Sequence, residues 1–328
     1  MIIISRCPYR ISLLGGSSDL DWYVNQKGYG LSLGFSIKLY TRVIVSFRDF
    51  SDRGILNYSS REEYKDLESI SHPIIRSCLK RFNLQKKIEL CSMGESLSGS
   101  GLGGSSSFSV ALVKAITKLN SLELNNNEIA HFASEIEIND LNKPIGRQDQ
   151  YLCALGGVNI LEFKPNGKVK KYKESLLTEA IEEFSKKLYI VNTNINRSAT
   201  STLSNLKKDS RSISSIDDIR KIALNFIEKS RNLNQKDIKE LLEIYIKDAW
   251  EVKRKMHGVM TKELFEIEAE IVKAEFSILK LLGAGGGGYF LTLFNGNSIE
   301  KSKSELEING LNLIKVEICK EGCISSNF

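Results

Sequence analysis

Several features that would assign this sequence to a common class are missing. The sequence contains no run of about 18 apolar residues, the length needed to span a membrane. The first residues enter a strand-like segment and lack the charged leader of a signal peptide. The six cysteines include no CxxC pair, and Cys319 and Cys323 have no histidine nearby, which argues against a zinc site. We therefore expect a soluble, cytoplasmic protein with reduced thiols and no membrane partner.

Charge of one sign is not concentrated anywhere in the chain. Lys and Arg outnumber Asp and Glu by 46 to 40, a net charge of +6, and the basic residues occur in short, scattered groups. An arm that binds nucleic acid would need a longer basic block, so we expect no nucleic-acid partner. A modest positive balance suits a protein that handles anionic ligands.

Only four prolines interrupt the chain, and no low-complexity linker separates its parts. A length of 328 residues nevertheless suits two domains better than a single core. The mixture of patterns changes after the Lys164-Pro165-Asn166-Gly167 turn, where the second half becomes richer in long helical segments. We place the boundary near residues 165–175, which predicts domains of residues 1–170 and 171–328.

The apolar patterns predict a mixture of strands and helices. Apolar residues at three- and four-residue steps predict a helix from Phe108 to Leu119 and a second helix capped by Asn125. Residues 176–187 and 216–282 have mostly helical, amphipathic patterns. Runs rich in β-branched and aromatic residues predict strands at 2–14, 30–48, 88–92, 158–163, 188–191, 289–294 and 313–318.

A loop rich in glycine and serine, residues 99–107, lies between a predicted strand and a predicted helix. Glycine allows backbone torsions that turn successive N–H groups toward a phosphate oxygen, and the helix start adds its positive end. Serine hydroxyls can donate to phosphate or bind Mg²⁺. A tight strand-to-helix turn could also be glycine-rich, but this density of glycine and serine favours phosphate binding.

Two common phosphate-binding loops do not fit this stretch. A P-loop ends in Gly-Lys-Ser/Thr, which the sequence lacks. Gly99, Gly101 and Gly104 match the dinucleotide pattern G-x-G-x-x-G, and Glu123 lies at a suitable distance, but that pattern belongs to the first strand-helix-strand unit of its fold. Here roughly ninety residues of strand-like chain precede it, so we reject the dinucleotide interpretation.

A second glycine-rich loop, residues 283–288, lies between a helical and a strand-like pattern. Glycine at this density allows a ligand or another segment of backbone to approach closely. Taken alone, the loop could equally be a hinge between the two elements.

Three segments together resemble motifs of the GHMP kinases, the family of galactokinase, homoserine kinase, mevalonate kinase and phosphomevalonate kinase. Residues 8–19 are similar to the N-terminal motif, residues 99–106 to the nucleotide-phosphate motif and residues 283–288 to the C-terminal motif. The resemblance implies a two-domain α+β fold. Its N-terminal, ATP-binding domain would be ribosomal-protein-S5-domain-2-like, and its C-terminal domain would be ferredoxin-like with extra helices.

Within the family, residues 144–157, 193–199 and 249–254 are similar to the branch that phosphorylates the anomeric hydroxyl of D-glycero-D-manno-heptose 7-phosphate. The resemblance implies an ATP- and Mg²⁺-dependent kinase whose partner is a sugar or sugar phosphate and whose product serves nucleotide-sugar synthesis; a homodimer is left open. Gly16 stands where galactokinases have a sugar-contacting glutamate, which argues against galactose. The alternatives are another GHMP kinase, acting on a different sugar or on mevalonate, and a sensor that binds ATP or sugar without turnover.

The resemblance also implies roles for single positions. Asp149 matches the catalytic base, and Arg10 matches an arginine that stabilises charge near the transferred phosphoryl group. Ser105 and Glu137 match the Mg²⁺ ligands. With 100° per residue, Glu137 lies at the margin of the buried stripe of its predicted helix, and Glu135 faces outward.

The remaining expected contacts divide between the nucleotide and the sugar. Four basic residues could hold a phosphate on the substrate: Arg147, Arg197, Lys253 and Arg254. The expected ATP-binding residues are Gly99, Ser100, Gly101, Leu102, Gly103, Gly104, Ser105 and Ser106. The expected substrate-binding residues are Gly16, Ser18, Asp19, Arg197, Gly285 and Gly286.

Overall fold

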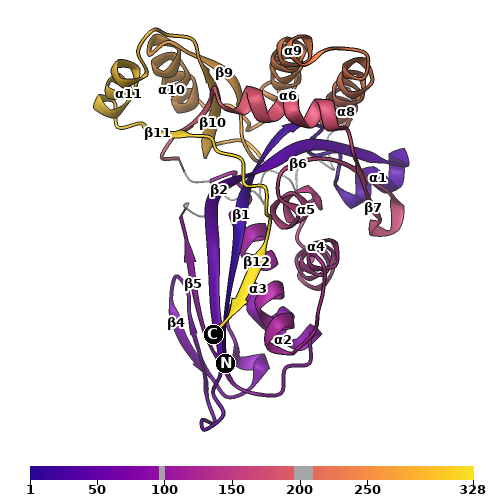
Figure 1. Cartoon of the computed structure of the whole chain (residues 1–328), viewed down its shortest axis with the longest axis vertical. Helices are drawn as coiled ribbons and strands as arrows, with labels where there is room; N and C mark the ends of the chain where they lie inside the picture. The colour runs from indigo at the N-terminus through magenta and orange to yellow at the C-terminus, as the bar shows by residue number, and fades with distance from the viewer. Residues whose placement is uncertain (96–99, 196–209) are drawn as a thin grey trace.

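The structure is a computed structural model that describes residues 1–95, 100–195 and 210–328, with backbone only at 210 and 211. It contains two sheets, each covered by helices, stacked along the long axis of the molecule (Figure 1). One sheet is mixed and has eight strands, and the other is antiparallel and has four. The expected α+β fold class is therefore confirmed.

Two long strands form the backbone of the larger sheet. Strand β1 (Ile2–Leu14) pairs antiparallel with β2 (Gly30–Phe47), and their register shifts at Pro8/Tyr9 and at Ser12/Leu14. Figure 1 shows both strands running from the end that holds the chain termini up to the C-terminal half. The β1 residues that follow the first shift therefore lie where the two halves of the molecule meet.

The other strands extend this pair on both sides. The sheet order is β12-β1-β2-β5-β3-β4, and β6 and β7 continue from the first part of β2. The last strand of the chain returns to the first sheet, since Ile324 pairs with Arg6 and Asn327 with Ile3. The bounds are β3 Gly54–Asn57, β4 Arg61–Tyr64, β5 Ile88–Gly94, β6 Val158–Phe163, β7 Val169–Tyr172 and β12 Ile324–Asn327.

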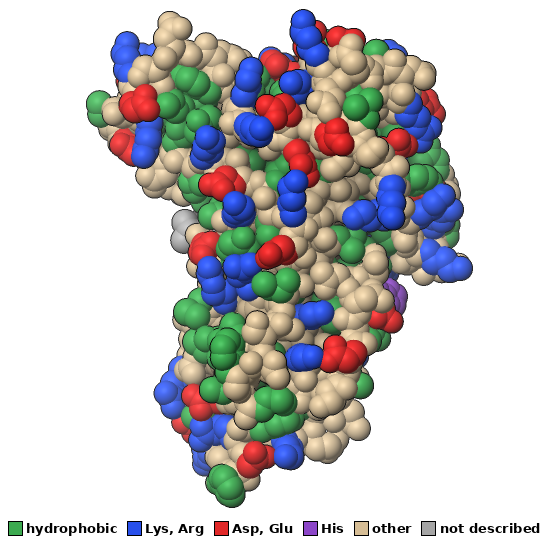
Figure 2. Space-filling view, in the orientation of Figure 1, with side chains coloured by type: hydrophobic (Ala, Val, Ile, Leu, Met, Phe, Trp, Pro, Cys, Tyr) green, Lys and Arg blue, Asp and Glu red, His purple; other side chains and the backbone are tan. Residues whose placement is uncertain are grey.

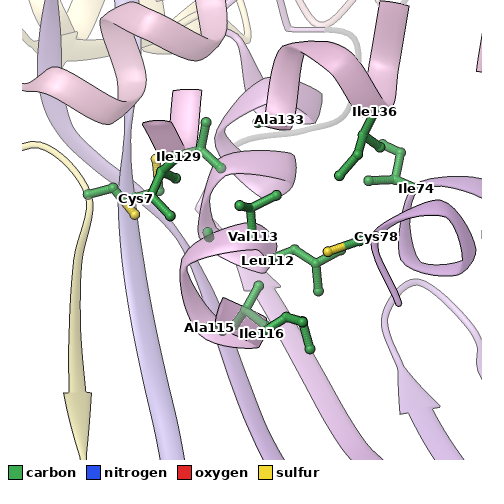
Figure 3. Close-up of a cluster of buried hydrophobic side chains, with 14 of the residues drawn as sticks. Cys7, Ile74, Cys78, Leu112, Val113, Ala115, Ile116, Ile129, Ala133 and Ile136 are labelled. Atoms are coloured by element: carbon green, nitrogen blue, oxygen red, sulfur yellow. The ribbon is translucent and has the colours of Figure 1, made fainter. Parts of the chain in front are cut away.

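Helices cover one face of this sheet and bury its first core. The central helix, α3 (Gly104–Leu119), carries the apolar stripe that its sequence predicts, and its neighbours are α2 (Pro73–Arg81) and α4 (Asn126–Glu135). Asn125 caps α4 as expected, because its side chain accepts from two backbone N–H groups while Glu128 reaches back to the Asn125 N–H. Figure 3 shows this core and labels Cys7, Ile74, Cys78, Leu112, Val113, Ala115, Ile116, Ile129, Ala133 and Ile136.

The second sheet has the order β11-β8-β10-β9 and supports the helices of the C-terminal half. Its strands are β8 Leu188–Asn192, β9 Phe276–Leu281, β10 Tyr289–Phe294 and β11 Asn312–Lys315. Its helices are α6 Ser175–Ser185, α8 Ser210–Ser230, α9 Gln235–Lys253, α10 Lys262–Lys273 and α11 Ile299–Ile308. Shorter helices elsewhere are α1 Asp21–Lys27, α5 Gln148–Leu155 and the π-helical turn η2 Ile136–Asp140.

One strand in this half is not predicted by the sequence. Residues 216–282 are mostly helical, as expected, but the helical part ends at Lys273 and Phe276–Leu281 is strand β9. The chain turns through Glu275, whose φ of 64° is left-handed, and the strand then pairs with β10. A short apolar run next to an amphipathic helix does not distinguish these two outcomes by periodicity.

The surface agrees with the scattered charge of the sequence. Figure 2 shows Lys and Arg side chains interspersed with Asp and Glu over the face that it draws. Among the helices of the described residues, none combines the length and the apolar character needed to cross a bilayer.

Candidate active site

A cavity of about 550 Å³ lies between the two glycine-rich loops. Its walls come from both halves of the molecule: the end of β1, the loop before α3, the starts of α3 and α5, the end of α9, and the loop after β9. The predicted motifs, which are far apart in the sequence, therefore meet around a single space.

The two glycine-rich loops touch each other through their backbones. A Cβ atom on Gly101 would lie 2.6 Å from the Leu282 carbonyl oxygen, and one on Gly283 would lie 2.5 Å from the Gly101 Cα. Both residues also have left-handed φ angles, 77° and 72°. Glycine is needed here because a side chain would separate the loops. The simple hinge is thus not the whole explanation of residues 283–288.

The first loop leads directly into α3. Gly103 is the N-cap residue, has a left-handed φ of 77°, and supplies no side-chain cap to the first backbone N–H groups. The first turn of the helix, Gly104 to Ser106, lines the cavity. Uncapped N–H groups and the positive end of a helix of 16 residues favour an anion at this position.

Arg10 and Asp149 form a two-pronged ion pair in the cavity. The Arg10 Nε atom donates to Asp149 Oδ1 at 2.7 Å, and Nη2 donates to Oδ2. Nη1 donates to the Gly101 carbonyl, so one guanidinium joins the carboxylate to the glycine loop. Burial disfavours the charged guanidinium, but the charge and hydrogen bonds of Asp149 outweigh it, and the pKa of Arg10 is raised.

Asp149 is held by its helix as well as by Arg10. It lies in the first turn of α5, whose N-cap is Arg147, so Asp149 is not the capping residue. A carboxylate in the first turn of a helix is stabilised by the helix dipole. Its side chain keeps 25% of its accessible surface, which leaves it open to a ligand in the cavity.

Asp19 is a second, deeper carboxylate on the same wall. It is only 2% exposed, and it accepts from the Gln148 backbone N–H at 2.9 Å and from Gln148 Nε2 at 3.2 Å. Gly146 permits this position, because a Cβ there would lie 1.9 Å from Asp19 Oδ2. Burial raises the pKa of Asp19 to about 7, although the hydrogen bond from Gln148 opposes the shift.

Glu137 and Ser105 supply two oxygen ligands beside the glycine loop. Glu137 is fully buried on the π turn η2, and its Oε2 atom accepts from Ser105 Oγ at 2.8 Å and from Lys143 Nζ at 2.8 Å. Gln150 Nε2 donates to the other oxygen at 3.0 Å. The Lys143 ammonium thus lies between the Ser105 hydroxyl and the Glu137 carboxylate. Two oxygen ligands that already hold a cation suit a hard metal ion, so they fit Mg²⁺.

Comparisons with known proteins agree with this geometry. Residues 71–157 match the domain described as the GHMP kinases N terminal domain. The chain has the GHMP kinase fold and carries a GHMP kinase N-terminal domain. The expected family, fold and class of enzyme, a phosphotransferase with an alcohol acceptor, are confirmed at this level.

One curated relative and several solved structures match most of the chain. The D-glycero-alpha-D-manno-heptose 7-phosphate kinase of Campylobacter jejuni is 28% identical over 302 residues, 88% of each protein. The structure of a D-glycero-D-manno-heptose 1-phosphate kinase from Bacteroides thetaiotaomicron superposes with a TM-score of 0.78, at 22% identity and 99% coverage of each chain. The Methanococcus jannaschii mevalonate kinase superposes with a TM-score of 0.69, at 20% identity and 98% coverage of each chain.

Most of the predicted site residues of this GHMP kinase domain come together. Among the residues expected at the site, thirteen line the cavity: Arg10, Gly16, Asp19, Ser100, Gly101, Gly103, Gly104, Ser105, Ser106, Glu137, Asp149, Lys253 and Gly285. Gly99 and Arg197 lie outside the described residues. Gly286 does not line the cavity, and its backbone N–H donates to the Val259 carbonyl.

Two predicted residues support the site from behind instead of lining it. Leu102 is buried, and its carbonyl accepts from the Arg10 N–H at 3.1 Å. Ser18 is also buried, and its hydroxyl donates to the carbonyls of Gly15 and Leu31. Both residues position neighbours, because their side chains pack or hydrogen-bond inside the protein.

The structure also separates the four basic candidates for a substrate phosphate. Arg147 is paired with Asp21 and Glu135, each at 2.9 Å, and Arg254 is paired with Glu251 and Glu268. Lys253 lines the cavity. Lys280, which the sequence analysis missed, lines it too. The sequence did contain a signal for Lys280, because it is a lysine inside an apolar run just before the glycine-rich loop of residues 283–288.

Proposed function

We propose that this chain transfers the γ-phosphoryl group of ATP to the anomeric hydroxyl of a sugar phosphate. The substrate that we propose is D-glycero-D-manno-heptose 7-phosphate, which would give the 1,7-bisphosphate. The observation that carries the proposal is the Arg10–Asp149 pair in a cavity bounded by the phosphate-loop candidate, residues 100–106. The Campylobacter relative, named as a heptose 7-phosphate kinase, supports the choice of sugar.

In this proposal Asp149 is the base. Its carboxylate takes the proton of the attacking hydroxyl while the new oxygen–phosphorus bond forms and the bond to the β-phosphate oxygen breaks, which releases ADP. Arg10 fixes the direction of the carboxylate through two hydrogen bonds and offers positive charge to the transferred group. Asp19 accepts hydrogen bonds from the sugar hydroxyls.

The nucleotide would be bound mainly by backbone groups. The N–H groups at Gly104, Ser105 and Ser106 lie at the uncapped start of α3, where phosphate oxygens can accept from them. Ser105 and Glu137 would hold Mg²⁺, which neutralises charge on the phosphates when it is bound. Lys143 would have to leave its present position between these two side chains.

The experiment that tests the function is ADP release by the purified chain with ATP, Mg²⁺ and a panel of acceptors. The panel contains D-glycero-D-manno-heptose 7-phosphate, D-mannose, D-galactose and mevalonate. We expect turnover with the heptose phosphate and a new phosphate ester at the anomeric carbon. Turnover on mevalonate alone, or ATP binding without turnover on any acceptor, would contradict the proposal.

A further inference from the structure

Two lysine ammonium groups in the cavity have no acidic partner among the residues that the structure describes. Lys253, at the end of α9, donates to the Gly283 carbonyl, and Lys280, on β9, donates to the Leu13 carbonyl at 2.9 Å. Lys280 is only 7% exposed. Within the described parts of the chain, neither ammonium has a carboxylate oxygen within 4.0 Å. Each of them therefore has one neutral acceptor in place of a counter-ion.

The lysines share the cavity with Arg10 and with Lys143, which is paired with Glu137, and the other nearby acids do not balance them. Asp149 is already paired with Arg10, and Asp19 is engaged by Gln148. Burial lowers the pKa of Lys253 to about 8, with Arg10 adding to the effect and Asp149 opposing it. Burial also lowers the pKa of Lys280, and the nearby positive charges of Lys253 and Arg10 lower it further. A buried cation without an anion is costly, so this wall favours binding a negative group.

The lysines and the nucleotide loop come from different halves of the molecule, although Lys253 donates to Gly283, which touches Gly101 of that loop. The loop of residues 100–106 belongs to the N-terminal half, whereas both lysines come from the C-terminal half. Lys280 contacts Leu13, the residue that leads into the segment Gly15–Asp19, where the sugar is expected. The other basic candidates in the described chain, Arg147 and Arg254, already have two acidic partners each.

We propose that Lys253 and Lys280 together bind the phosphate group that the acceptor sugar already carries. This assignment rests on the proposed function. It also explains how the kinase would select its substrate, because two ammonium groups favour a phosphorylated acceptor over a neutral one. An ammonium donates to phosphate oxygens as a charge-assisted hydrogen bond, which is stronger than a bond between neutral groups.

The test uses Lys253→Met and Lys280→Met, with Lys255→Met as the matched control, since Lys255 is exposed just beyond the end of α9. Methionine keeps the length of the lysine stem and removes its charge. We expect the KM for D-glycero-D-manno-heptose 7-phosphate to rise about tenfold to a hundredfold in both variants. The Kd for ATP should stay within about twofold, and the control should match the wild type.

Folding is checked in the same proteins by thermal unfolding. Removing a charge that has no carboxylate partner among the described residues should not lower the Tm, and Lys280→Arg, which restores a cation, should recover part of the affinity for the sugar phosphate. A higher Kd for ATP with an unchanged KM for the sugar phosphate would mean that the lysines bind the nucleotide. An unchanged Kd and KM in both variants would mean that they bind neither.

A second measurement separates this inference from the proposed function. Inorganic phosphate, titrated by calorimetry into the chain without ATP, should bind the wild type and the Lys255→Met control, and should bind the two lysine variants at least tenfold more weakly. If the lysine variants bind phosphate more weakly but the wild type does not turn over the heptose phosphate, only the proposed function is contradicted. Turnover of the heptose phosphate with wild-type KM in both variants would contradict only the lysine assignment.

Discussion

Arg10 and Asp149 are 139 positions apart in the sequence and are joined by two hydrogen bonds in the structure. Arg10 comes from the strand after the first register shift of β1, and Asp149 comes from the first turn of α5. The third donor of Arg10 reaches Gly101. One guanidinium thus sets the position of the proposed base relative to the proposed phosphate loop.

The first prediction concerns this guanidinium. Arg10→Lys keeps the charge but cannot donate to both carboxylate oxygens, so Asp149 loses its fixed direction. We expect kcat to fall about a hundredfold to a thousandfold, the loss typical of removing one group that stabilises transition-state charge, with a smaller change in the Kd for ATP. Steady-state kinetics and calorimetry measure the two quantities. Arg6→Lys, on the same strand but paired with Glu321, is the control; equal losses in both variants would contradict the account.

The second prediction concerns the proposed metal ligands. Glu137→Gln keeps the shape and the hydrogen bond from Ser105 but removes the charge, so binding of a divalent cation should weaken at least tenfold. Electron paramagnetic resonance of Mn²⁺ in the presence of ATP measures this without relying on activity. Glu123→Gln, on an exposed side chain, is the control. Unchanged Mn²⁺ binding in Glu137→Gln would remove Glu137 from the metal site.

The third prediction concerns the contact between the glycine loops. Gly101→Ala and Gly283→Ala each place a methyl group under 3 Å from backbone atoms and require a left-handed φ. Each should lower the free energy of unfolding by about 1–3 kcal/mol, as urea titration would show. Gly104 has no heavy atom within 4 Å of a Cβ, so Gly104→Ala should change stability by less than about 0.5 kcal/mol. Equal effects at all three positions would contradict the close approach.

The fourth prediction concerns Asp19 and pH. Its pKa is raised from 3.8 to about 7, so between these values the native state keeps a proton that the unfolded chain releases. The free energy of unfolding of the wild type should therefore fall, relative to Asp19→Asn, as the pH rises through this window. Urea titrations of both proteins at about pH 5 and about pH 8 test it. A difference in stability that does not depend on pH would show that Asp19 titrates normally.

The residues of this site can be named from the sequence, but the contacts between them cannot. Asp149 and Arg10 could be named from the resemblance, but their pairing depends on how β1 and α5 pack, which no local pattern contains. Glu137 shows the same limit. Regular helical geometry places it at the margin of a buried stripe, whereas the π turn and its partners Ser105, Lys143 and Gln150 leave it fully buried.

The parts that the sequence analysis missed have physical reasons. Strand β9 continues the apolar character of the preceding helix, so its period is ambiguous until it pairs with β10. Strand β12 is short and mostly polar, and it forms because the chain end returns to β1. Lys280 is surrounded by apolar residues in sequence, and only the folded cavity shows that it faces the site.

The turnover of Asp149→Asn tests the central claim most directly. Asparagine keeps the size of the side chain and can still accept from Arg10, but it cannot take a proton from a hydroxyl. We predict that kcat with the heptose phosphate falls by about a thousandfold or more, because the base is lost and the Arg10 pair is also weakened, while the Kd for ATP changes by less than about threefold. A variant that keeps kcat within about tenfold of the wild type would contradict the assignment of Asp149 as the base.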